Sequence, residues 1–100
     1  MKNTYRPLPA SLTIKQSEIE GLGLFATEDI LSHMVLGVSH YKIGRGYIRT
    51  PLGGFINHAE DSNCKKLLTN NNRFYLITKR LIKAGEELTL TYTLYNVTYR

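Results

Sequence analysis

The sequence has a single cysteine, Cys64, and no tryptophan among its 100 residues. One cysteine excludes an internal disulfide framework and a zinc site built from cysteines of this chain, and it favours a reducing compartment. No apolar run approaches the ~20 residues that a membrane-spanning helix needs, and the first ten residues lack the apolar core of a secretory signal. We therefore expect an intracellular protein without a membrane partner, either cytoplasmic or, if a virus or pathogen encodes it, inside the host cell.

The chain is also short, and its length limits the function. One hundred residues form one domain with one core, since 42% are hydrophobic and 21% charged, which are globular proportions. A core of this size leaves no room for a separate cofactor domain. A Rossmann dehydrogenase, a kinase and a TIM barrel are therefore excluded.

Acidic residues are scarcer than basic ones. The chain has 8 Asp and Glu against 13 Lys and Arg, which gives a formal net charge of +5. The excess is even along the chain, with six basic and four acidic residues in 1–50 and seven and four in 51–100. This balance fits an ordinary solvated surface, or attraction to nucleic acid or to something bound to it.

No segment keeps a helical period over three turns, and the alternation of apolar residues predicts a mostly β protein. We expect strands over 12–15, 24–26, 34–38, 73–79 and 87–93, with turns at 20–23, 70–72 and 84–86. In the last strand Leu88, Leu90 and Tyr92 share one face, and threonines occupy the other.

A weak internal echo links two segments. Residues 30–36 and 82–88 both read as an apolar anchor, a turn and then a strand, and His33 stands where Gly85 stands. Histidine is one of the residues other than glycine that tolerate a positive φ. Two copies are too few for a repeat protein, and chance is a competing explanation.

Three short motifs lie far apart in the chain: Gly21-Leu22-Gly23-Leu24-Phe25-Ala26, Phe55-Ile56-Asn57-His58 with Asn63 after it, and Gly85-Glu86-Glu87-Leu88-Thr89-Leu90-Thr91-Tyr92. Each alone is common, and a Gly-Glu-Glu turn is simply good hairpin chemistry. In this order and spacing they resemble the SET-domain family of S-adenosylmethionine-dependent protein lysine methyltransferases. The resemblance divides the chain into an N-terminal arm (1–11), a SET domain (12–95) and a C-terminal tail (96–100).

The resemblance implies a mostly β fold of several small curved sheets, with the C-terminal segment threaded under a loop as a pseudoknot. Only residues 39–53 remain for the insert that the family carries, so the chain is similar to its compact viral and bacterial members. Arg45 and Arg49 in this short insert point to an acidic or nucleic-acid-associated partner.

The family also implies a binding site for S-adenosylmethionine. Gly21, Leu22 and Gly23 would lie along its methionine part, where glycines let the backbone come close. Asn57 and His58 would contact its adenine and methionine ends. Ala59 replaces the serine of the family pattern, and Ser62 replaces a proline, which leaves the rigidity of this loop in question.

Tyr92 matches the catalytic tyrosine of the family, and Tyr95, Tyr47 and Tyr75 are candidates for lining the channel of the substrate lysine. Each has a plain alternative as a core or surface tyrosine. Only eight residues follow Tyr92, and none is a cysteine. The resemblance therefore implies no metal and no zinc-bound post-SET lid, and Cys64 becomes either an apolar filler or a surface thiol.

Without that lid, another part must close the channel. Residues 96–100, the N-terminal arm or a second subunit could do so, and the last would make a homodimer. Two other functions remain open at this point. One is a catalytically degenerate SET-like module that binds protein or nucleic acid, and the other is an unrelated small basic β-barrel that binds single-stranded nucleic acid through its aromatic residues.

Overall fold

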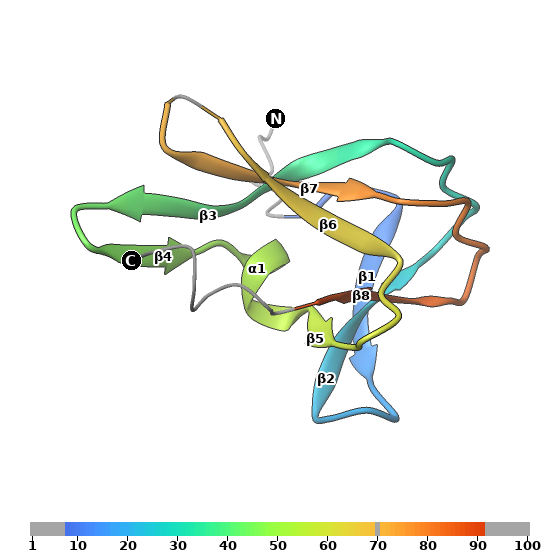
Figure 1. The fold of residues 1–100 in the computed structure, drawn as a ribbon. Coiled ribbons are helices and arrows are strands. Elements are labelled where there is room, and N and C mark those ends of the chain that lie inside the picture. Colours follow the sequence, from blue (N-terminus) through green and yellow to red (C-terminus); the bar gives the residue numbers. More distant parts are fainter. Residues whose placement is uncertain (1–7, 70, 92–100) are drawn as a thin grey trace, which may run out of the picture.

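The computed structural model describes residues 8–69 and 71–91 and is built almost entirely of short strands (Figure 1). The strands are β1 (Leu12–Gln16), β2 (Leu22–Ala26), β3 (Val35–Ile43), β4 (Gly46–Arg49), β5 (Asn57–His58), β6 (Cys64–Leu68), β7 (Arg73–Thr78) and β8 (Glu87–Leu90). Between β4 and β5 lies a helix of one turn, α1 (Pro51–Phe55). The prediction of a mostly β chain is confirmed.

The strands follow the order β1-β2-β8-β6-β7-β3-β4, and the short β5 pairs with β8 off this path. The pairs β1–β2, β2–β8, β6–β7, β7–β3 and β3–β4 are antiparallel, whereas β8 runs parallel to β5 and β6. Strand β8 therefore joins the β1–β2 hairpin to the larger sheet, as Figure 1 shows near its centre. The pseudoknot predicted for the chain after β8 falls on residues 92–100, outside the described residues.

The core lies around β8, and this corrects one detail of the predicted pattern. Leu88 and Leu90 are buried as expected, but Thr89 on the opposite face is only 8% exposed. A strand with neighbours on both edges and layers on both faces has no solvent side. The Thr89 hydroxyl is satisfied there, because it accepts a hydrogen bond from the backbone N–H of Asn63 at 3.2 Å.

The segment 39–54, which the sequence pattern left unassigned, forms the end of β3, then β4 and α1. Thr50 caps α1 by accepting a hydrogen bond from the N–H of Gly53, and Pro51 starts the helix. A side chain at Gly53 would collide with the carbonyl oxygen of Ser39. The glycine therefore allows α1 to pack directly on β3.

The internal echo is a real structural symmetry. Ile30 and Ile82 pair with each other through two backbone hydrogen bonds of 2.7 and 2.8 Å. His33 and Gly85 both have positive φ, 61° and 90°. Their N–H groups donate to equivalent carbonyls, His33 to Thr78 at 3.0 Å and Gly85 to Ala26 at 2.8 Å. The segments 26–36 and 78–88 thus share one backbone pattern around a local twofold.

The two faces of the sheet formed by β6, β7, β3 and β4 differ. One face packs on α1 and the core, while the other leaves large apolar side chains exposed, among them Tyr41, Ile43, Ile48 and Leu67. The homodimer expected from the sequence stays a prediction. The one helix in the described part of the chain spans five residues, too few to cross a membrane.

Candidate active site

The three sequence motifs meet at the side chain of Asn57. This residue lies in β5, which β8 holds in place by parallel pairing with Thr89. Its Nδ2 lies 2.9 Å from Glu87 Oε2, 3.1 Å from Ser17 Oγ, 3.0 Å from the Glu20 carbonyl and 3.4 Å from the Leu22 carbonyl. Such a set of acceptors fixes the amide, with Nδ2 toward the β1–β2 turn and Oδ1 on the other side.

Glu87, the first residue of β8, forms the second half of this network. Ser17 donates its hydroxyl hydrogen to the Glu87 carboxylate, whose two oxygens both lie 2.9 Å from Oγ. Gly23 lies directly against that carboxylate, and a Cβ at this position would overlap Glu87 Oε2. A side chain at residue 23 would displace the Glu87 carboxylate, so glycine here lets that carboxylate lie against the backbone of β2.

Asn63 fixes the position of β8 relative to this network. Its Nδ2 donates to the Glu87 carbonyl at 2.9 Å, and its Oδ1 accepts from the Thr89 N–H at 2.8 Å. Both groups are buried, so an unpaired partner would carry a desolvation cost of ~1–3 kcal/mol. The Asn63 amide thus makes the hydrogen bonds to Glu87 and Thr89 that a neighbouring strand would make, and it fixes the direction of the Glu87 side chain.

The remaining predicted cofactor residues surround the same spot. Gly21 has a φ of 47° and closes the β1–β2 turn, where its carbonyl accepts from the Ser17 N–H at 2.7 Å. Leu22 is 52% exposed beside the Asn57 amide. His58 is exposed and pairs with Leu90. The structure therefore brings Gly21, Leu22, Gly23, Asn57 and His58 into one region.

The family-model comparison now decides the family: the model described as the SET domain matches residues 39–93, more than half of the chain. The chain belongs to the SET-domain family. The predicted family and its mostly β fold are confirmed, and the alternative of an unrelated basic β-barrel is removed. A search of curated protein sequences finds no match.

Solved SET structures resemble the chain in fold. A candidate histone methyltransferase of Plasmodium falciparum is 18% identical, with a TM-score of 0.70 over 88% of this chain and 98% of that one. The methyltransferase domain of human PR domain-containing protein 2 is 22% identical, with a TM-score of 0.66 over 89% and 81%. At these identities the likeness establishes the fold alone.

The four tyrosines predicted for catalysis and the lysine channel of this SET domain do not form one visible cluster. Tyr92 and Tyr95 lie outside the described residues. Tyr47 packs on the core-facing side of the sheet, with its ring centroid 5.6 Å from that of Phe74. Tyr75 follows Phe74 in β7 and so points to the opposite face. The structure therefore does not bring Tyr47 and Tyr75 together.

Cys64 is a buried filler of the SET-domain core. It is 1% exposed, and burial raises the pKa of its thiol to about 12. A thiol held neutral in this way is a poor nucleophile. Within residues 8–69 and 71–91 no group of three or more His, Cys, Asp or Glu side chains could hold a metal ion.

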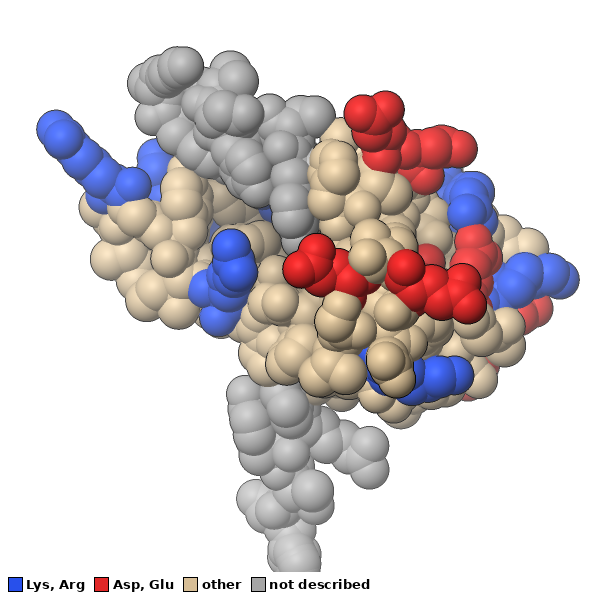
Figure 2. Space-filling model, turned by 90° about the horizontal axis from the view of Figure 1, so that it is seen from below, with Lys and Arg blue, Asp and Glu red and all other residues tan. Residues whose placement is uncertain are grey.

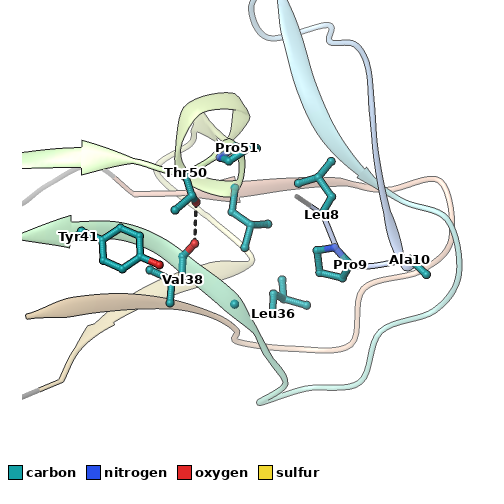
Figure 3. A pocket seen from close by; sticks show the side chains of 10 residues that line it. Leu8, Pro9, Ala10, Leu36, Val38, Tyr41, Thr50 and Pro51 are labelled. Atoms are coloured by element: carbon teal, nitrogen blue, oxygen red, sulfur yellow. Dashed lines mark hydrogen bonds between the residues drawn. The ribbon is translucent and has the colours of Figure 1, made fainter. Parts of the chain in front are cut away.

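An open cavity of about 550 Å³ lies away from Asn57, along the edge of β3 (Figure 3). Leu36 and Val38 from β3, Thr50 and Pro51 at the start of α1, and residues 8–10 line it. Thr50 donates its hydroxyl hydrogen to the Val38 carbonyl at 2.6 Å on one wall. None of the lining residues belongs to the three motifs, so this cavity is separate from the candidate site.

Sequence reasoning missed two residues of the network. Glu87 was inside the third motif, but a Gly-Glu-Glu turn is so common that its carboxylate gave no functional signal. Ser17 had no signal, because it lies outside the motifs, four residues before Gly21, and meets Glu87 across 70 positions of the chain.

Proposed function

We propose that this SET domain transfers a methyl group from S-adenosylmethionine to a lysine side chain of a protein. The observation that supports it best is the convergence of Gly23, Asn57 and Glu87, one residue from each motif, at the start of β8. The same strand ends at Leu90 and leads directly to Tyr92. Glu87 of the candidate cofactor site and the candidate catalytic tyrosine are therefore carried by one short segment.

The hydrogen-bond acceptors at this site suit the amino-acid end of S-adenosylmethionine. Asn57 Oδ1, directed away from its own hydrogen-bond network, and the nearby Glu87 carboxylate are acceptors for an α-ammonium group. Gly21, with no atom within 4 Å of an added Cβ, leaves the backbone of the β1–β2 turn open to close approach. When bound, S-adenosylmethionine supplies a methyl group activated by a positive sulfur.

The chain's own residues must then provide a neutral lysine nitrogen. A lysine ammonium has a pKa of ~10.4, so deprotonation at pH 7 costs roughly 4–5 kcal/mol. A tyrosine with a pKa of ~10 gains nothing as a base. We assign Tyr92 to positioning the lysine and to stabilising the transferring methyl through its hydroxyl oxygen, and the loss of the lysine proton to an apolar channel that disfavours the ammonium.

Cofactor binding can be tested without knowing the substrate. Isothermal titration with S-adenosylmethionine and with its demethylated product should give one site per chain. Gly23→Ala should weaken binding at least tenfold (about 1.4 kcal/mol), because the added methyl displaces the Glu87 carboxylate. Gly46→Ala is the matched control: it changes another strand glycine, and the atom nearest to its new Cβ is 3.8 Å away.

The catalytic assignment needs a second measurement. Transfer of labelled methyl groups to an array of lysine-containing peptides should fall at least a hundredfold in Tyr92→Phe (about 2.7 kcal/mol), with cofactor affinity nearly unchanged. Unaltered turnover in this variant would remove the role given to Tyr92. Cofactor binding without any transfer would favour the degenerate binding module instead.

A further inference from the structure

Acidic and basic residues occupy different parts of the fold, although the two halves of the sequence carry nearly the same net charge. All eight acidic residues lie in 18–29, 60–61 and 86–87, so the ranges 30–59 and 62–85 contain none. These two ranges hold β3, β4, α1, β5, β6 and β7. The basic residues from β3 to β7 are Lys42, Arg45, Arg49, Lys65, Lys66 and Arg73.

Figure 2 shows this separation on one face of the molecule. Acidic side chains gather over its middle and right-hand part, whereas the left-hand part, where Figure 1 places the β3–β4 hairpin, shows only Lys and Arg among the described charged residues. The hairpin projects from the sheet, and its residues Lys42, Arg45 and Arg49 are exposed. One end of the molecule is therefore positive and accessible.

Two of these basic side chains, Arg49 and Lys66, lie with the His40 ring on the core-facing side of this sheet around Phe74. His40 pairs with Arg49 across β3 and β4 and with Phe74 across β3 and β7. Lys66 Nζ lies 4.9 Å from the centroid of the Phe74 ring, and the His40 ring meets its edge at 6.1 Å. Burial, then the charges of Lys66 and Arg49, lower the pKa of His40 to about 4.

The cluster lies next to the candidate site. Lys66 shares a sheet face with Cys64, two residues or ~7 Å along β6. Cys64 pairs with Leu90, the last residue of β8, and Tyr92 follows two positions later. A peptide that presents a lysine near the end of β8 would therefore have its flanking residues within reach of His40, Arg49 and Lys66.

We propose that the β3–β4 hairpin and Lys66 form a substrate-reading surface that selects lysines flanked by aspartate and glutamate. This inference rests on the proposed methyl transfer to a protein lysine. The half-buried Lys66 and the exposed Arg49 offer hydrogen-bond donors to carboxylates in a partly desolvated place, where charge-assisted bonds are stronger than in open water. Neither range contains an acidic residue that would repel the carboxylates of such a peptide.

An acidic peptide fits this surface better than nucleic acid does. The basic side chains form a compact group beside a site that must already accept a peptide, whereas a single strand of nucleic acid needs a charged track with exposed aromatic rings for stacking. Phe74, at the centre of the group, is only 7% exposed and already packs against His40, Tyr47 and Lys66.

The test is a fluorescence-anisotropy titration of the full chain with two short labelled peptides. Each has a central lysine, flanked by glutamate in one peptide and by glutamine in the other, and both are measured with and without the demethylated cofactor product. We expect the glutamate peptide to bind at least tenfold more tightly at low salt, and the difference to shrink as salt screens the charges.

Variants assign the preference to this surface. Arg49→Gln and Lys66→Met should each reduce the glutamate preference severalfold, and exposed Lys42→Gln gives a third variant if packing at Phe74 is disturbed. Lys83→Gln is the charge-matched control, because Lys83 is exposed in the β7–β8 connection, outside the basic sheet. It should leave the preference within twofold.

The outcomes separate this inference from the methyltransferase proposal. Cofactor binding and methylation with no preference for glutamate would overturn the substrate inference alone. Glutamate-dependent peptide binding without cofactor binding would overturn the enzyme and keep the surface. Absence of peptide binding in the millimolar range, or tighter binding of a single-stranded oligonucleotide that the same three variants weaken, would refute the acidic-peptide assignment.

Discussion

The two turns related by the local twofold have the same backbone and different chemistry. Met34 and Val35 occupy the positions that Glu86 and Glu87 occupy in the second turn. Met34 and Val35 are 46% and 59% exposed. Glu87 by contrast reaches Ser17 and Asn57, and Glu86 bonds Arg80.

This difference teaches that the turn itself does not need a glutamate at position 87, whose side chain bonds only Ser17 and Asn57 among the described residues. The first turn keeps the bonds of His33 to Thr78 and of Thr78 to Met34, which match those of Gly85 to Ala26 and of Ala26 to Glu86, although apolar residues occupy both positions. Only the second turn adds a bond from the Lys83 N–H to the Glu86 carboxylate. The Gly-Glu-Glu sequence is therefore more than hairpin chemistry: Glu87 is present for its contacts with Asn57 and Gly23. A symmetric scaffold carries the candidate site on only one of its halves.

The difference between the two turns is tested most directly by Glu87→Val, which gives the second turn the residue that the first turn has at this position. The change removes the charged acceptor of Ser17 and Asn57, so the Asn57 amide loses its fixed orientation. We expect S-adenosylmethionine affinity to fall about 30-fold, or ~2 kcal/mol, with the fold retained. Titration calorimetry beside a melting curve checks both.

The matched control is Glu86→Met, the same exchange one position earlier. Among the described residues Glu86 has no hydrogen bond to Asn57 or Ser17 and reaches the network only through Asn63, so cofactor affinity should fall far less than in Glu87→Val. Equal losses in both variants would mean that the acidic turn acts through its general charge. An unchanged affinity in Glu87→Val would remove Glu87 from the site.

The next largest effect is expected from Gly85→Ala, which tests how much the positive φ in the second turn contributes to stability. Gly85 has a φ of 90° and open space around its Cβ position, so the cost is conformational and amounts to about 1–2 kcal/mol. The mirror change His33→Gly should alter the free energy of unfolding by less than ~0.5 kcal/mol. Glycine removes the cost of the positive φ in the folded state, but it also makes the unfolded chain more flexible, and the two effects on stability largely cancel. Urea denaturation measures both, and equal effects would contradict the asymmetry.

The strand after the first turn should also respond to pH, because β3 carries His40. Its pKa of about 4 lies below the ordinary value of 6.5, so the unfolded chain binds more protons between these two values. The free energy of unfolding should therefore fall as the pH drops from about 6.5 to about 4, by ~1 kcal/mol after allowance for solvent screening.

His40→Gln isolates this contribution from the carboxylates, which titrate in both proteins. Unfolding free energies at pH 7 and pH 4.5 should differ less in the variant than in the parent chain. The Lys66 and Arg49 charges oppose protonation of His40, so the parent should show the steeper slope. Identical slopes would mean that His40 does not report on the basic cluster.

The smallest effect is expected at the Arg80–Glu86 ion pair. Its atoms lie 2.6 Å apart, yet the Arg80 side chain is 54% exposed. The Arg80 guanidinium lowers the pKa of the Glu86 carboxyl, but an exposed pair contributes little to stability. Arg80→Gln should change the free energy of unfolding by no more than about 0.5 kcal/mol, and a larger loss would mean that this turn depends on its charges after all.

Much of the fold was predictable from sequence because its signals are local. Alternation located most of the strands, and Asn72 takes the positive φ expected of the 70–72 turn. His33 was predicted to imitate Gly85, and it does. The β3–β4–α1 segment was not predictable, since its structure depends on α1 packing against β3 at Gly53.

The candidate site was predictable only where a motif marked it. Asn57 and Gly23 carried a signal, but their partner Ser17 lies 40 positions from Asn57 and 70 from Glu87. The separation of Tyr47 from Tyr75 depends on strand register, which composition does not reveal. The basic cluster likewise required the pairing of β3 with both β4 and β7, because its members are spread over residues 40–66.

The central place of β8 has a consequence for how the chain folds. Both neighbours of β8, the β1–β2 hairpin and the sheet from β6 to β4, precede it in sequence, so neither is joined to the other until the last described strand inserts between them. During synthesis the strand edges that β8 will pair with stay exposed until β8 has been made. The sheet is then completed by contacts between residues far apart in the sequence. Such distant pairing predicts slow folding, with cofactor capacity appearing only in the final step.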